Sequence, residues 1–86
     1  MNLSSMRPTD SGPVAYAVAC DLVNGDRLWW NAVRGWVDKG PTLVDDNGKA
    51  VEMCRKARIA AFKKRVNNPK TFIVVRFIII ELYVSD

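Results

Sequence analysis

The fold is decided by the stretch Thr71-Phe-Ile-Val-Val-Arg-Phe-Ile-Ile-Ile-Glu-Leu-Tyr-Val84. Successive side chains of a strand point to opposite faces, and here both faces are apolar. This pattern is typical of a central strand, which is covered on both sides. At roughly 3.3 Å per residue the strand would be about 45 Å long, and a chain of 86 residues can hardly cover both of its faces. We therefore expect a partner, either a second copy or another protein.

A β-hairpin is predicted before this strand. Residues 14–23 alternate between larger apolar side chains and alanine, and residues 27–33 return as a second strand. The dipeptide Asn24-Gly25 between them favours a two-residue type I′ turn. The sequence therefore predicts an antiparallel pair joined by a tight turn.

Two adjacent tryptophans lie in the second strand of this hairpin. A two-residue turn would place Cys20 opposite Trp29 and Ala19 opposite Trp30, so that Trp30 covers the alanine face. Neighbouring residues of a strand face opposite ways, so the two indoles cannot share one core. One of them should pack under a helix, and the other should lie on the second face of the sheet.

A single long helix is predicted over residues 47–66. Asp45 and Asp46 are suitable N-cap residues, which place negative charge at the positive end of the helix. The basic run Lys63-Lys64-Arg65 in the last turn, followed by Asn67-Asn68-Pro69, marks the end of the helix.

Together these elements predict an α+β fold in the order β-β-(β)-α-β. A small antiparallel sheet of three strands carries the helix on one face, and Thr42-Leu43-Val44 would add a fourth strand at a sheet edge. Residues 38–41 are predicted to form a turn. We expect residues 14–86 to form one α+β domain and residues 1–13, which are rich in Ser and Pro, to form a flexible arm.

The composition argues against an enzyme. The chain has no His, which is the commonest general base and metal ligand. It also lacks a phosphate-binding loop, a CxxC pair and a nucleophile elbow. Asp45, Asp46 and Glu52 could in principle hold a metal, but a helix cap explains the aspartates more simply. We therefore expect no catalytic residue, no metal and no cofactor.

Cysteine content and hydropathy suggest the compartment. Cys20 and Cys54 are too few for a disulfide framework, so two buried reduced thiols are expected, with a single bridge as the alternative. The final apolar run is interrupted by Arg76 and Glu81 and is shorter than the roughly 20 residues that span a bilayer. No signal-peptide pattern is present. We expect a cytoplasmic protein without membrane association.

The predicted helix has two apolar arcs. Alanines, with Met53 and Cys54, form one side, which can lie close against a sheet. Larger side chains, Ile59 and Phe62 among them, fall on a separate arc between arginines. This second arc either wraps around the sheet edge or forms an exposed binding patch. The predicted partner-binding residues are Arg55, Arg58, Ile59, Phe62, Arg65 and Trp29, and the predicted self-association residues of a homodimer are Phe72, Arg76, Phe77, Ile79 and Tyr83.

Positive charge is concentrated on the helix and the residues after it. Residues 49–70 contain eight basic residues and one acid, while the whole chain has a formal charge of +4. Such a surface can contact phosphates, so a nucleic-acid-binding protein that uses helix 47–66 is the alternative function. An ordinary solvated helix face would have the same composition.

The order of motifs resembles small phage-encoded accessory proteins with a compact β-β-α-β unit. The resemblance is carried by Trp29-Trp30-Asn31, Gly35-Trp36-Val37, the run Thr42-Leu43-Val44-Asp45-Asp46 before the helix, and the apolar last strand. Val44 replaces the usual aromatic residue, and the N-terminal arm is extra. The resemblance implies a non-enzymatic protein that binds a host or defence protein and inhibits it by occlusion. It identifies no functional residue.

Overall fold

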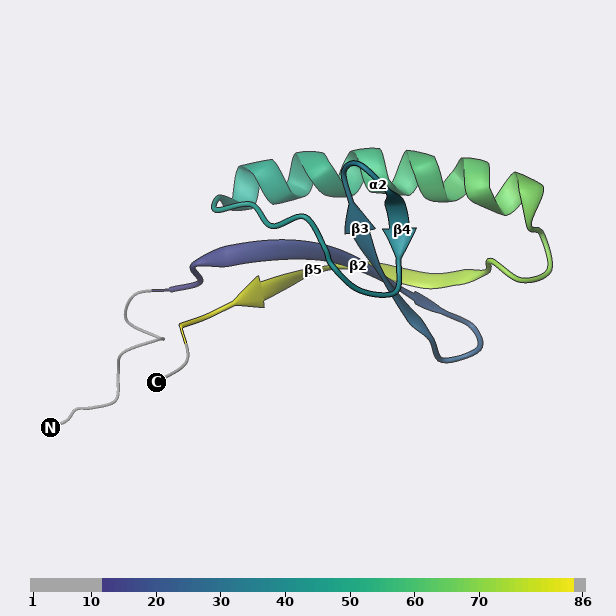
Figure 1. Ribbon diagram of the computed structural model, residues 1–86, viewed down its shortest axis with the longest axis horizontal. Helices are drawn as coiled ribbons and strands as arrows, with labels where there is room; N and C mark the ends of the chain where they lie inside the picture. The colour runs from purple at the N-terminus through teal and green to yellow at the C-terminus, as the bar shows by residue number, and fades with distance from the viewer. Residues whose placement is uncertain (1–11, 85–86) are drawn as a thin grey trace, which may run out of the picture.

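The computed structural model describes residues 12–84. Residues 1–11 and 85–86 lie outside the described residues, so the predicted arm of residues 1–13 falls almost entirely outside them. In chain order the elements are β2 (Ala15–Leu22), β3 (Arg27–Asn31), β4 (Gly35–Val37), α2 (Asn47–Asn67) and β5 (Val74–Leu82). Within the described residues, one helix lies across a four-stranded antiparallel sheet, which confirms the predicted α+β fold (Figure 1).

The strand order in the sheet is β4-β3-β2-β5. Helix α2 runs above the long ribbon of β2 and β5, while the short strands β3 and β4 run steeply across it (Figure 1). β5 is therefore an edge strand, and the prediction of a central strand is wrong. The short hairpin places β3 on one side of β2, and the crossover through α2 returns β5 to the other side.

The β2–β3 hairpin is present, but its register differs by one residue from the predicted one. Ala19 pairs with Trp29, and Cys20 pairs with Leu28. Trp29 therefore lies on the alanine face and Trp30 lies in the core. The division of the two indoles between the faces is as predicted, but their assignment is reversed.

A three-residue loop, Val23–Gly25, causes this shift. The Leu22 N–H donates to the Asp26 carbonyl at 2.8 Å, and the Gly25 N–H donates back to the Leu22 carbonyl at 3.0 Å. Gly25 has a φ of 96°, which suits the residue that closes a three-residue hairpin loop. The Asn24 side chain accepts from the Asp26 N–H at 2.9 Å and holds this loop.

β4 is a strand that the sequence pattern did not indicate. Its Trp36 pairs with Trp30 of β3, but three residues are too few to show an alternation. The predicted strand Thr42-Leu43-Val44 instead makes a single bridge, between Val44 and Tyr16.

Helix α2 begins and ends close to the predicted residues. The carboxylate of the N-cap residue Asp46 accepts from the Gly48 N–H at 3.0 Å. At the other end, the Asn68 N–H donates to the Arg65 carbonyl at 3.1 Å. Neither α2 nor any other helix in residues 12–84 has the length and apolar character needed to cross a membrane.

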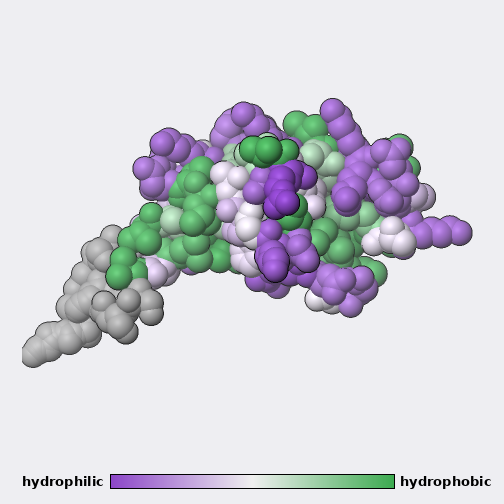
Figure 2. All heavy atoms as spheres, in the orientation of Figure 1, coloured by the Kyte–Doolittle hydropathy of each residue, from purple (hydrophilic) through white to green (hydrophobic). Residues whose placement is uncertain are grey.

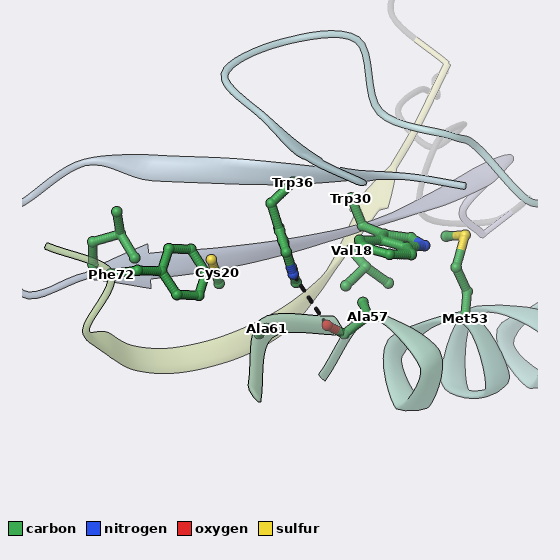
Figure 3. Packing of buried hydrophobic residues seen from close by; sticks show 9 residues of the cluster. Val18, Cys20, Trp30, Trp36, Met53, Ala57, Ala61 and Phe72 are labelled. Carbon is green, nitrogen blue, oxygen red and sulfur yellow. Dashed lines mark hydrogen bonds between the residues drawn. The ribbon is translucent and has the colours of Figure 1, made fainter. Parts of the chain in front are cut away.

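The core lies between α2 and one face of the sheet (Figure 3). The sheet contributes Val18, Cys20, Trp30 and Trp36, and α2 faces them with Ala50, Met53, Ala57 and Ala61. The small helix side chains allow a close approach, so that the Trp36 Nε1–H donates to the Ala57 carbonyl at 3.1 Å (Figure 3). The alanine side of α2 is therefore its buried side, which leaves the larger apolar side chains elsewhere on the helix.

Candidate protein-binding groove

The second apolar arc of α2 remains on the surface. Ile59 is 55% exposed and Phe62 is 80% exposed, and Val51 and Val66 are exposed as well. In Figure 2 the helix carries mostly polar side chains with apolar ones between them, and apolar surface gathers beneath it. Phe62 and Val66 therefore do not wrap around the sheet edge into the core.

A groove lies beneath this arc, between α2 and β5. One end is a hollow of about 390 Å³, and a second hollow of about 490 Å³ continues it along the helix; Arg58 and Ile59 line both. The helix lines this α2–β5 groove with Arg55, Arg58, Ile59, Phe62 and Arg65, and the opposite wall is formed by Phe72, Val74, Phe77 and Ile79. All five helix residues that the sequence predicted for partner binding thus lie together.

The arginines of the groove differ in their contacts. Arg55 pairs with Glu52 at 3.0 Å. The Arg58 guanidinium lies 5.4 Å from the centre of the Phe77 ring, in a cation–π contact that leaves its charge uncompensated. Among residues 12–84, no carboxylate lies within salt-bridge distance of Arg58 or Arg65. The groove therefore offers positive charge to an acidic group.

The outer edge of β5, with which no strand pairs in the described part of the chain, forms a further part of this surface. Tyr16 exchanges backbone hydrogen bonds with Val44, on the side of β2 away from β5. Because backbone groups alternate along an antiparallel strand, Ala17 and Ala19 face β5 and bond to their partners Ile80 and Ile78.

The intervening residues of β5 consequently point away from the sheet. The N–H and C=O groups of Phe77, Ile79 and Glu81 face the open edge, beside the α2–β5 groove. The apolar pattern of residues 72–84 predicted self-association through a sheet face or edge, without deciding between the two. The element order could have indicated the edge, since a hairpin-bound β2 leaves β5 only an outer position.

Two of the predicted site residues lie on the opposite face of the sheet, which α2 does not cover. Trp29 pairs with Ala19 there, and Arg27 lies 6.0 Å from its ring centre. Arg76 donates to Asp21 at 2.8 Å on the same face. Trp29 is therefore separated from the helix residues with which it was grouped, and Arg76 from Phe77 and Ile79.

Phe72 and Tyr83 also differ from their predicted surroundings. Phe72 is 3% exposed and belongs to the core, so it forms the floor of the groove and offers little area for self-association. Tyr83 is exposed, and its hydroxyl donates to Glu81 at 2.7 Å.

Asp21 links β2, β3 and β5 on the uncovered face. It accepts from Arg27 at 2.7 Å and from Arg76 at 2.8 Å. These two hydrogen bonds lower the pKa of the Asp21 carboxyl to about 2. The pair of arginines thus favours the ionised carboxylate in the folded protein.

The Asp21 network should make stability depend on pH at acidic values. Because the folded pKa lies below the unfolded one, the stabilisation is present above about pH 4 and is lost as the pH falls towards 2. Urea unfolding at pH 6 and pH 2.5 should therefore show a smaller acid-induced loss for Asp21→Asn than for the unmodified protein. Asp38→Asn, in an exposed turn, is the control. The same loss in all three proteins would contradict this role.

Both cysteines are free thiols; Cys20 is buried, as expected, whereas Cys54 is only half-buried. Burial raises the pKa of the Cys20 thiol to about 11, and burial also raises that of Cys54. A thiol rather than a thiolate is the stable form of each at neutral pH, which makes them poor nucleophiles. In residues 12–84, no three His, Cys, Asp or Glu side chains lie close enough together to hold a metal ion.

Comparison with protein-family models, with curated protein sequences and with solved structures finds no match to this chain. The geometry of the α2–β5 groove and of the β5 edge therefore carries the functional argument.

Proposed function

We propose that this protein is a non-enzymatic protein-binding module and that the α2–β5 groove is its binding surface. One observation carries the proposal: an exposed phenylalanine, arginines without carboxylate partners and an open strand edge lie side by side. Protein interfaces concentrate binding energy in aromatic and arginine side chains. Phe62 would be the apolar anchor, while Arg58 and Arg65 would pair with acidic groups of the partner and orient it.

The kind of partner remains a prediction from the sequence. The resemblance to phage accessory proteins predicts occlusion of a host or defence protein, and the apolar last strand predicts a homodimer. Both uses are compatible with the groove, because a bound chain of either kind would cover Phe62 and the open edge of β5.

Variants of the groove test the proposal. A protein captured from cell extract and then purified should bind Phe62→Ala roughly thirtyfold more weakly than the unmodified protein, the effect of removing an anchor worth about 2 kcal/mol. Arg58→Ala should weaken binding less, and its effect should shrink as salt rises. Val33→Ala is the control, since Val33 is 93% exposed and lies in the β3–β4 turn. Equal binding by all four proteins would contradict the proposal.

Nucleic-acid binding by α2 is the second candidate function. It is supported by the basic residues of the helix, of which Lys63, Lys64 and Arg65 are exposed near its end. Binding to mixed-sequence DNA or RNA that falls steeply with salt, and that survives Phe62→Ala, would favour this function over the groove.

A further inference from the structure

We propose that two copies of the chain join edge to edge through β5, in antiparallel orientation, so that their sheets form one continuous sheet of eight strands. This inference rests on the proposed function, because it takes the α2–β5 groove as a protein interface, and it names a second copy as the chain that covers the groove. The second copy is inferred from the backbone groups at the outer edge of β5 and from the register in which β5 can pair with itself.

The first support is the backbone of β5. Phe77, Ile79 and Glu81 present their N–H and C=O groups to the open edge. Within residues 12–84 no strand pairs with this edge of β5, and such an edge is a template for a further strand. The pairs Asp21–Arg76 and Leu22–Val74 leave Val75 without a partner, so β5 has a bulge at Val75, and its edge is regular from Arg76 to Leu82.

The second support is the register that full overlap of the two strands requires. When Val74–Leu82 pairs antiparallel with its own copy, Ile78 lies on the twofold axis and Phe77 lies opposite Ile79. Phe77 and Ile79, whose backbone groups both point outward, then face each other, so their N–H and C=O groups can bond across the interface. The apolar side chains on both faces of β5 also align with those of the second copy, which extends the apolar layer on each side.

The third support is the position of the helices. α2 contacts both β2 and β5, and adjacent strands lie about 4.8 Å apart, so the two helices would run about 10 to 14 Å apart across the axis. Helices in contact lie about 8 to 10 Å apart, which leaves a narrow space to be filled. Ile59 and Phe62 project from α2 on this side, and both are exposed in one copy alone.

The fourth support is the distribution of charge. In the same register Glu81 lies opposite Val75, next to Val74, which lines the same hollow as Arg65. Glu81 of each copy therefore approaches Arg65 of the other, at two symmetric places. Arg58 of both copies lies near the axis above the joined strands, where the two residues together form a positively charged site for an acidic partner.

A proline at Glu81 tests this arrangement with little disturbance of the single chain. The Glu81 N–H points away from β2, so Glu81→Pro removes no hydrogen bond within the sheet, and edge strands tolerate proline. It removes one inter-copy bond at each of two symmetric places and should raise the dimer dissociation constant roughly tenfold or more. Glu81→Ala removes the carboxylate alone and should have the smaller effect.

Light scattering or sedimentation equilibrium of the purified full chain gives the result. The unmodified protein should be a dimer at tens of micromolar, Glu81→Pro should be mostly monomeric, and Phe62→Asp, on an exposed helix position that cannot unfold the core, should also dissociate. A 9.7 kDa monomer at all concentrations would overturn the inference. So would a dimer that persists in both Glu81→Pro and Phe62→Asp, since the copies would then meet at another surface.

The same variants separate this inference from the proposed function. If Glu81→Pro is monomeric but still binds the captured protein, the dimer is correct and the other partner binds one copy alone. If the unmodified protein is monomeric and loses its partner on Phe62→Ala, the edge-to-edge dimer is wrong and the groove still binds protein.

Discussion

Replacing Trp36 by alanine should lower the free energy of unfolding by about 3–5 kcal/mol, the usual cost of removing a buried aromatic side chain. Trp36 packs edge-on against Trp30 with ring centres 5.4 Å apart, and it contacts Phe77 and the carbonyl of Ala57. The indole of Trp36 therefore connects the short strand β4 to helix α2, to Trp30 of β3 and to Phe77 of β5. Small domains have about 5–15 kcal/mol of stability in all, so much of the protein should unfold near body temperature.

Trp29→Ala is the matched control for this substitution. Trp29 lies on the uncovered face of the sheet, so its removal should cost clearly less than that of Trp36. Urea unfolding followed by circular dichroism at equal protein concentration measures both. A Trp29 variant as unstable as the Trp36 variant would contradict the present register of the hairpin, in which Trp29 is outside the core.

Phe72→Ala should also destabilise the protein by about 3–5 kcal/mol, whereas Phe62→Ala should leave stability within about 0.5 kcal/mol in the monomer. Both side chains line the α2–β5 groove. Phe72 is 3% exposed and belongs to the core, while Phe62 is 80% exposed and contributes little to it. The pair thus separates the floor of the groove, which is structural, from its rim, which is available for binding.

Denaturation of the two variants at a concentration that keeps them monomeric provides the measurement. The loss of stability of each variant can then be compared with its loss of binding. Phe62→Ala should weaken binding without unfolding the protein, although it is the less destabilising of the two substitutions. Equal destabilisation by the two substitutions would mean that Phe62 packs in the core and that the groove is closed.

The sequence predicted the elements of the fold because each carried a strong local signal. Alternating residues with Asn24-Gly25 indicated the hairpin, and Asp46 with the basic last turn indicated the limits of α2. The details that failed are the length of the hairpin loop and the place of β5 in the sheet, which the alternation of residues does not determine. The loop Val23–Gly25 takes three residues because Asn24 bonds to Asp26, and this choice reverses the two tryptophans.

The candidate site could be predicted only in part, for the same reason. The helical periodicity placed Arg58, Ile59 and Phe62 on one arc, and the structure places them along one groove. The position of β5 at the edge of the sheet depends on the order of the strands, which the residue pattern within β5 does not show. The sequence pattern showed that β5 has two apolar faces, but a central strand and an edge strand that pairs with another chain have the same pattern.

Amide hydrogen exchange along β5 tests most directly whether another chain joins this edge. The amides of Ile78 and Ile80 bond to β2 and should exchange slowly at every concentration. Those of Phe77 and Ile79 face the open edge, and they should exchange fast in dilute solution and slowly when the protein is concentrated or its partner is bound. Fast exchange at Phe77 and Ile79 under all of these conditions would contradict the claim that the β5 edge is a protein interface.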